Sequence, residues 1–223
     1  MKFLSSSRIA AGFFMLAIPG ILLAGGAQAG AWSFPGSGHM FSCSREVSAS
    51  PKSLLGEHYS PEENLESIDV DLIDHARQRI EIAMYAFTDR PIAEALVRAA
   101  SRGVRIFLYR DGIQIRDRGD KSGHILSSRA GRSGLVQIEV KRNSSRNIMH
   151  LKAYAIDGKW LRTGSANWSP PGEGAYCTRG YRNSWNQQDN NLFITGNPRE
   201  VRRFEKTFRR IWTRGSTRPW SPN

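Results

Sequence analysis

The chain has 223 residues, of which 39% are hydrophobic and 23% are charged, and its formal net charge is +12 at pH 7. These values are ordinary for a soluble globular protein with one well-cored domain, and no segment after the N-terminal stretch is apolar enough to span a membrane. A basic balance of this size predicts attraction to polyanions: nucleic acid, anionic lipid or acidic envelope polymers. Charge alone leaves that choice open.

The first 29 residues have the features of a secretory signal peptide. Lys2 and Arg8 flank the start of an apolar stretch over residues 9–24, and residues 27–29 form a small-residue cleavage pattern. The stretch is short for a spanning helix, which needs about 20 apolar residues, so we favour cleavage over a membrane anchor. We therefore expect an exported protein, periplasmic or secreted, with no stable membrane insertion after cleavage.

The rest of the chain divides by composition. We expect a flexible leader over residues 30–53, rich in Gly, Ser and Pro, then one folded domain over residues 54–216 and a tail over residues 217–223. An insertion at residues 170–187 could be a lid or substrate-guiding loop, or a tolerated surface excursion.

The chain contains two cysteines, Cys43 and Cys177. In an oxidising compartment they could form one disulfide, or they could remain separate thiols. Two cysteines without a supporting histidine cluster do not form a structural zinc site.

Strand-like and helix-like segments alternate along the domain. In chain order we expect a short strand ending at residues 59–61, a helix over 65–76, a strand over 80–87, a helix from the cap at 88–89 to Gly103, a strand over 104–109, a polar and ambiguous segment over 115–132, a strand over 136–140, a hairpin over 151–163, a strand over 192–195 and a helix over 199–213. This alternation predicts an α/β fold with a mixed β-sheet sandwiched by helices.

The predicted hairpin turns at Asp157-Gly158, a strong two-residue turn signal between two apolar, strand-prone runs. A two-residue turn pairs Lys152 with Thr163. Two residues further from the turn, it pairs His150 with Ser165. The turn residue therefore sets which polar side chains face one another.

Side chains alternate along a strand, so this register predicts that four polar residues share one face: His150, Lys152, Ser165 and Asn167. Opposed Cβ atoms lie roughly 5 Å apart, a spacing that suits several groups binding one phosphate. Asp157 has the opposite parity and occupies the turn. We interpret it as a residue that shapes the hairpin and holds a neighbour, and not as a proton carrier.

These residues resemble the signature of the phospholipase D superfamily, His-x-Lys-x4-Asp-x6-Gly-Ser-x-Asn, with every fixed position filled. Further segments look like its small, secreted, single-motif bacterial endonuclease branch: Tyr59-Ser60-Pro61, residues 83–89, residues 99–104 and Gln188-Asp189-Asn190. The resemblance covers roughly residues 55–214. It implies a phospholipase D-like fold and a phosphodiesterase that hydrolyses nucleic acid, DNA or RNA, without a cofactor.

The resemblance also implies roles for the site residues. His150 attacks phosphorus and forms a phosphohistidine that water resolves, while Lys152 and Asn167 hold nonbridging oxygens. Ser165 supports the phosphate or the histidine. Asp189 stands where the family has a carboxylate, commonly Glu, that holds the second ring nitrogen of the histidine. Asp is one methylene shorter, and the alternative is an Asp that simply starts the strand.

A metal role for His150 is disfavoured, because the cationic Lys152 on the same face opposes a bound divalent ion and the hairpin lacks clustered carboxylates.

One chain carries one copy of the motif. Attack and leaving-group protonation occur on opposite sides of phosphorus, so one His150 cannot easily do both in a single step. The resemblance implies a two-fold homodimer whose second His150 supplies the proton.

Several alternatives remain open. The protein could be a phospholipase D acting on phospholipid headgroups, or a catalytically dead polyanion-binding protein. Trp168 and Trp185 could stack on bases or pack in the core. Seven cations in the last helix could contact phosphates or form a solvated face: Arg199, Arg202, Arg203, Lys206, Arg209, Arg210 and Arg214.

Overall fold

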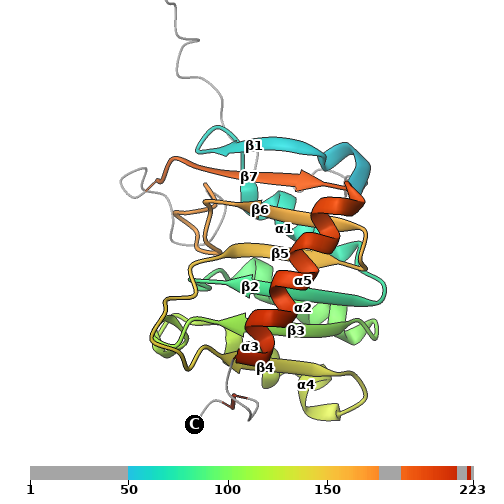
Figure 1. Ribbon diagram of the computed structural model, residues 1–223, viewed down its shortest axis with the longest axis vertical. Coiled ribbons are helices and arrows are strands. Elements are labelled where there is room, and N and C mark those ends of the chain that lie inside the picture. The colour runs from blue at the N-terminus through green and yellow to red at the C-terminus, as the bar shows by residue number, and fades with distance from the viewer. Residues whose placement is uncertain (1–49, 176–186, 215–219, 222–223) are drawn as a thin grey trace, which may run out of the picture. The chain divides into compact units, whose positions relative to one another are not determined.

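The computed structural model describes residues 50–175, 187–214 and 220–221. Within them, seven strands form one mixed sheet in the order β1-β7-β6-β5-β2-β3-β4 (Figure 1). The strands are β1 (Gly56–Ser60), β2 (Arg79–Met84), β3 (Arg105–Arg110), β4 (Ile138–Arg142), β5 (Lys152–Ile156), β6 (Trp160–Gly164) and β7 (Asn190–Thr195). Strands β2, β3 and β4 are parallel, whereas β5, β6, β7 and β1 pair antiparallel.

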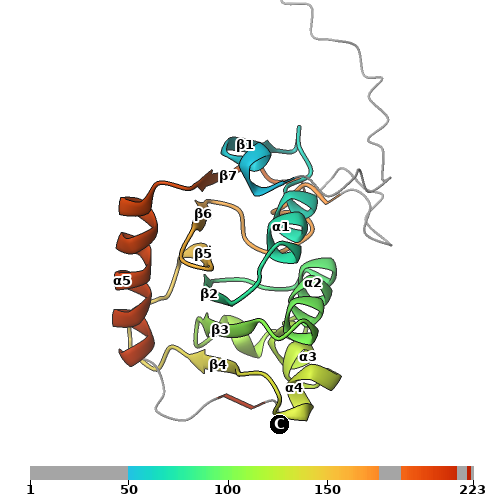
Figure 2. The same ribbon diagram turned by 90° about the vertical axis from the view of Figure 1, so that its right-hand side faces the viewer.

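Helices cover both faces of this sheet (Figure 2). On one face lie α1 (Leu65–Asp74), α2 (Arg90–Ser101), α3 (Ser122–Leu126) and α4 (Arg129–Ser133), and α5 (Pro198–Arg214) crosses the other. Two short 3₁₀ helices, η1 (Pro51–Leu54) and η2 (Gln114–Arg116), complete the described elements. The predicted α/β fold with a mixed sheet between helices is confirmed.

Each face of the sheet has its own apolar core. The larger core packs α1 and α2 against the sheet through residues such as Leu72, Leu96 and Ile82. The smaller core lies under α5, where Phe204 and Phe208 pack with residues of β5 and β6. Burial on both faces explains why the central strands read as almost continuous apolar runs.

Local sequence signals predicted the ends of most helices and strands to within a few residues of their observed positions. Asp89 caps α2, as predicted, because its Oδ1 accepts a 3.0 Å hydrogen bond from the backbone N–H of Ile92. The ambiguous polar segment folds into η2, α3 and α4. Strand β2 ends at Met84 rather than Phe87, because Phe87 leaves the ladder and forms an isolated bridge with Trp168.

The predicted hairpin register is wrong by one residue. Lys159 N donates to Ile156 O at 2.9 Å across a turn whose two central residues have positive φ, as expected for Asp-Gly. However, Ile156 pairs with Trp160 and Tyr154 pairs with Arg162, so Lys159 stays outside the ladder. This slip turns Arg162 toward α1, and parity along the strands therefore does not explain how the polar residues meet.

Among the described residues, none of the helices combines the length and the apolar character that crossing a membrane requires. The predicted signal peptide, Cys43, Cys177 and Trp185 lie outside the described residues.

Candidate active site

His150 and Lys152 meet at the start of β5. The Lys152 Nζ lies 3.1 Å from the His150 Nε2 and donates to the His150 backbone oxygen at 2.9 Å. Lys152 is only 7% exposed, and this burial lowers the pKa of its ammonium group below the ordinary value. Because an ammonium can only donate, the His150 Nε2 lone pair accepts a hydrogen bond from Lys152 in this contact.

Tyr85, which follows β2, packs against this pair. Its ring lies 4.5 Å from the His150 ring in an edge-to-face arrangement, and the Lys152 Nζ lies 5.0 Å from the Tyr85 ring centroid. The Tyr85 backbone N–H also donates to Leu151 O at 2.9 Å. Sequence reasoning missed Tyr85 as a site residue. The only signal was its place within residues 83–89, which resemble the family.

Asn167 reaches the same strand end from the other side of the hairpin. Its Oδ1 accepts a 3.2 Å hydrogen bond from the backbone N–H of Ala86, the residue after Tyr85. A backbone N–H only donates, so this contact fixes the amide oxygen inward and leaves the NH₂ group as a donor. Asn167 can therefore present an N–H to an anionic oxygen, the chemistry predicted for it.

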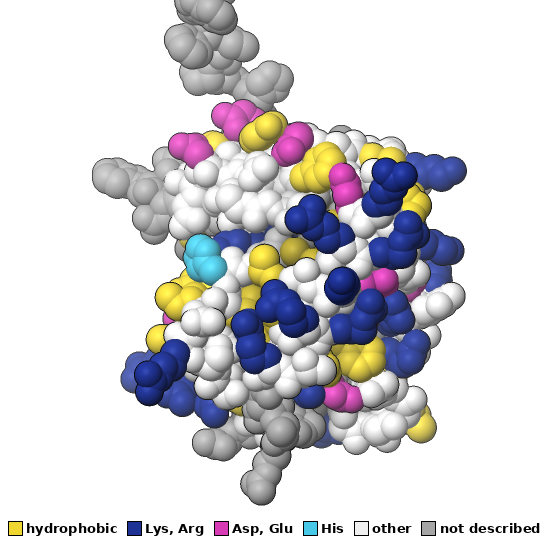
Figure 3. Space-filling model, in the orientation of Figure 1, with side chains coloured by type: hydrophobic (Ala, Val, Ile, Leu, Met, Phe, Trp, Pro, Cys, Tyr) yellow, Lys and Arg dark blue, Asp and Glu magenta, His cyan; other side chains and the backbone are white. Residues whose placement is uncertain are grey.

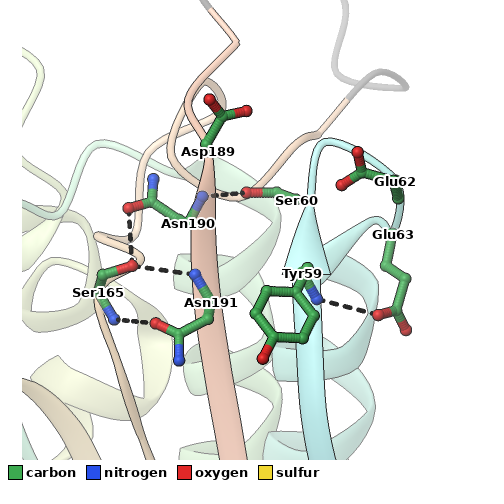
Figure 4. Close-up of a pocket in the computed structure, with 8 residues that line it drawn as sticks. All are labelled: Tyr59, Ser60, Glu62, Glu63, Ser165, Asp189, Asn190 and Asn191. Carbon is green, nitrogen blue, oxygen red and sulfur yellow. Dashed lines mark hydrogen bonds between the residues drawn. The ribbon is translucent and has the colours of Figure 1, made fainter. Parts of the chain in front are cut away.

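Ser165 joins β6 to β7 and, in the described residues, makes no hydrogen bond with His150. Its hydroxyl donates to Asn190 Oδ1 at 2.9 Å and accepts from the Asn191 backbone N–H at 2.9 Å (Figure 4). These contacts border an open hollow of about 660 Å³, lined by Tyr59, Ser60, Glu62, Glu63, Ser165, Asp189, Asn190 and Asn191. Ser165 therefore shapes the rim beside the site.

Asp189 is exposed and directly precedes β7, and its carboxylate points away from Ser165 and the neighbouring asparagines in Figure 4. Within the described part of the chain it forms no hydrogen bond with His150. The predicted contact with the second imidazole nitrogen is thus not made inside one chain.

Asp157 lies at the far end of β5 from Lys152. Its carboxylate accepts hydrogen bonds from three successive backbone N–H groups, those of Arg77 at 2.9 Å, Gln78 at 2.8 Å and Arg79 at 2.9 Å. The side chain therefore anchors the start of β2 to the turn. This is the geometry expected of a residue that shapes the hairpin and holds a neighbour.

A buried arginine lies beneath the site. Arg162 is fully buried, and its Nη1 donates to the backbone oxygens of Lys152 and Ala166, each at 3.1 Å. Ala166 lies between Ser165 and Asn167, so one guanidinium connects the two halves of the motif. Sequence reasoning missed Arg162, because the predicted register paired Tyr154 with Leu161 instead.

Buried carboxylates hold this guanidinium. Arg162 donates to both oxygens of Asp69, at 3.1 and 2.8 Å, and to Glu173 at 3.0 Å. Burial opposes the charge of Arg162, but the attraction of Asp69 and then Glu173 keeps its pKa above the ordinary value. Burial, followed by the charge of Asp69, raises the pKa of Glu173 well above its ordinary value.

The buried network around Arg162 explains two features of the sequence. Asp69 stands on the apolar face of α1 between Leu65 and Leu72, and a carboxylate at a core position predicts a buried cationic partner. Glu173 belongs to the insertion, whose described residues 170–175 pack into the fold at this point.

Trp168 is part of the core and does not face the site. Its side chain is 0% exposed, its Nε1 donates to Asp69 Oδ2 at 2.8 Å, and its ring packs against Phe87 and Tyr154. Base stacking by Trp168 is therefore excluded.

Comparison with known proteins identifies the family. The chain is 27% identical over 141 residues to the mitochondrial cardiolipin hydrolase of Xenopus tropicalis, covering 63% of this chain and 58% of that protein. It is 27% identical over 123 residues to a phospholipase D of Rickettsia bellii, covering 55% of this chain and 57% of that protein. The chain thus spans little more than half the length of these relatives.

The fold is also found in solved structures. The structure of Nuc from Salmonella typhimurium, a phospholipase D family member, matches with a TM-score of 0.60 and 26% identity, covering 74% of this chain and 97% of that chain. NucT from Helicobacter pylori matches with a TM-score of 0.57 and 21% identity, covering 71% of this chain and 95% of that one. Residues 70–212 match the family described as cardiolipin synthase, PLD-like domain, and the chain therefore belongs to this phospholipase D-like family.

Proposed function

We propose that this protein is a metal-independent phosphodiesterase that hydrolyses nucleic acid through a phosphohistidine at His150. The observation that carries the proposal is the 3.1 Å contact between the Lys152 Nζ and the His150 Nε2. This contact sets a ring nitrogen beside a cation at an exposed residue, where a polymer can approach. Both groups are needed to attack a phosphodiester and to neutralise its oxygens.

In the first step, the Lys152 N–H that bonds the His150 Nε2 turns to a nonbridging oxygen of the substrate. The freed Nε2 lone pair attacks phosphorus, and the bond to the leaving alkoxide breaks. The Asn167 NH₂ group donates to the other nonbridging oxygen. Water then attacks the phosphohistidine, the N–P bond breaks, and a phosphomonoester leaves.

Two requirements of this reaction are not met by the described residues of one chain. The departing alkoxide needs a proton from the side of phosphorus opposite His150, and the second imidazole nitrogen needs an acceptor. A two-fold homodimer would bring a second His150 to the leaving group. It would also let Asp189 of one chain reach the His150 of the other, which fits an exposed carboxylate that points away from Ser165 in Figure 4.

Nucleic acid is favoured as substrate by the net charge of +12 and by the resemblance to the small secreted endonuclease branch. We extend the proposal to an exported location on the basis of the N-terminal residues. A second candidate is hydrolysis of phospholipid headgroups, since relatives of 27–29% identity are named mitochondrial cardiolipin hydrolases.

The decisive experiment incubates the purified protein with plasmid DNA, RNA, and vesicles containing cardiolipin or phosphatidylcholine, each with and without EDTA. The matched control is His150→Ala, which removes the nucleophile from an exposed position. We expect nucleic-acid cleavage that survives EDTA and disappears in the control. Hydrolysis of lipid alone would support the second candidate. Binding without turnover would indicate a catalytically dead polyanion-binding protein.

The dimeric site has its own test. Co-refolding wild-type and His150→Ala chains should give heterodimers that are severely impaired, because general-acid assistance is typically worth about 10²–10⁴ in rate. Full activity in a preparation shown to be monomeric by light scattering would reject the shared site.

A further inference from the structure

Helix α5 has a cationic outer face. Seven of its residues are Lys or Arg, all seven are exposed, and Figure 3 shows such side chains gathered over the face that α5 crosses. They are Arg199, Arg202, Arg203, Lys206, Arg209, Arg210 and Arg214. The apolar residues of the helix alternate with them at helical spacing and are buried against the sheet. The outward face is therefore almost purely basic.

The helix does not neutralise these charges itself. Its buried acid, Glu205, pairs at 2.7 Å with Arg79 of β2, and the other acid, Glu200, lies in the first turn. In the described part of the chain, no carboxylate lies within ion-pair distance of Arg202, Arg203 or Lys206. Like charges three and four residues apart destabilise a helix, and so do cations in its first turn. Two of the seven cations do have partners in the fold, since Arg209 attracts Glu81 and Arg214 hydrogen-bonds Tyr109. Fold stability therefore does not explain the central cations Arg202, Arg203 and Lys206.

We propose that the outer face of α5 is a second binding surface for the sugar-phosphate backbone of nucleic acid, separate from the His150 site. This inference rests on the proposed function and adds where the polymer is held. Arg199 and Arg214 are 15 residues apart, so the face extends for about 22 Å. Such a length spans roughly six phosphates of one strand of a duplex.

The chemistry of the face favours nucleic acid over a membrane surface. A helix that binds lipid inserts its apolar side, whereas the apolar side of α5, with Phe204 and Phe208, is buried under the sheet. Six of the seven cations are arginines, whose planar guanidinium groups bind phosphate oxygens bidentately. The surface is thus suited to discrete phosphates rather than to insertion between lipids.

The surface is also independent of the chemistry. In the described residues, α5 packs against the sheet, and no hydrogen bond, ion pair or ring contact joins its side chains to His150 or Lys152. Neutralising the face should weaken binding of a polymer and leave the hydrolysis of a small phosphodiester unchanged.

The test replaces four central cations in one variant: Arg202→Gln, Arg203→Gln, Lys206→Gln and Arg210→Gln. A matched control removes four exposed arginines near α3 and α4: Arg116→Gln, Arg118→Gln, Arg129→Gln and Arg132→Gln. Both variants lose the same net charge. Each is also made with His150→Ala, so that binding to a fluorescent 20-base-pair duplex is measured by anisotropy across a series of KCl concentrations without cleavage.

We expect the α5 variant to reduce the slope of log affinity against log salt by about 0.9 for each lost contact, about 3–4 in total, and the control to change it by less than about 1. With active His150, hydrolysis of bis(p-nitrophenyl) phosphate should be equal in both variants. A charge-retaining variant, Arg202→Lys with Arg203→Lys and Arg210→Lys, should keep the salt slope.

Equal loss of duplex binding in the α5 and control variants would overturn the proposal, as would no loss in either. Loss of binding to anionic vesicles with unchanged duplex binding would instead assign the face to membranes and also overturn it. The binding assay does not depend on turnover. If the wild type hydrolyses nothing while the α5 variant still loses duplex affinity, the proposed catalytic function fails and the binding surface stands.

Discussion

Replacing Arg162 tests whether the buried network holds the catalytic groups in place. The guanidinium makes five hydrogen bonds: two to Asp69, one to Glu173 and one each to the backbone oxygens of Lys152 and Ala166. All of these contacts are made by a side chain with no solvent exposure. Any substitution must therefore leave buried partners unsatisfied.

The expected magnitude follows from those partners. Arg162→Met keeps most of the volume but leaves the Asp69 carboxylate without its cation, which typically lowers stability by about 3–5 kcal/mol. Each carbonyl left unpaired adds about 1–3 kcal/mol, although these terms do not add in full. We expect a loss of roughly 5 kcal/mol, comparable with the whole stability of many domains. The urea midpoint should fall accordingly.

Arg162→Lys separates positioning from stability. An ammonium retains the cation for Asp69 but cannot also reach Glu173 and two carbonyls. The variant should fold, while a displacement of about 1 Å in Lys152 or Asn167 should lower kcat by up to about 10²-fold. The assay is hydrolysis of bis(p-nitrophenyl) phosphate, with thermal unfolding measured on the same sample.

A double variant then decides between two roles for Arg162. Combining Arg162→Met with Asp69→Asn removes the uncompensated charge and should restore much of the stability, yet kcat should stay low because the two carbonyls remain unheld. Wild-type kcat in Arg162→Lys, or recovery of kcat together with stability in the double variant, would refute the positioning argument.

Three further predictions follow from single residues. Burial, and then the charge of Glu66, raises the pKa of Asp89 to about 9. The folded state therefore binds a proton that the unfolded chain releases, and stability falls as pH rises from about 4 to 9. Asp89→Asn should flatten this dependence in urea midpoints measured at pH 5 and 8, and parallel curves for the two proteins would contradict the assignment. Burial lowers the pKa of Lys152, so kcat/KM plotted against pH should begin to fall on the alkaline side at a pH below 10.5. Lys152→Arg should move this fall to higher pH. If the fall stays at the same pH in the variant, it belongs to another group. Asp157→Ala removes an acceptor shared by three backbone N–H groups and should lower stability by about 2–4 kcal/mol, with kcat of the folded fraction within about threefold of wild type; an inactive but fully stable variant would give Asp157 a chemical role.

Sequence alone determined the features that depend on neighbouring residues. The Asp157-Gly158 turn, the Asp89 cap and the amphipathic pattern of α5 are each encoded within a few positions, and all are present in the structure. The complete family motif also predicted which residues to examine and which fold to expect. Such local signals are reliable because the physical causes, backbone conformation and side-chain periodicity, act at short range.

Only the tertiary structure decided how these residues meet. Lys159 stays outside the ladder and shifts the hairpin register by one residue. The alternation of side chains along a strand, which repeats every two residues, cannot reveal such a shift. Tyr85 lies against His150, and Arg162 binds an Asp69 that is 93 positions away in the chain. An ion pair such as Arg162–Asp69 depends on which two buried charges lie next to each other across the core. That choice is set by desolvation in the folded protein, and no local pattern records it.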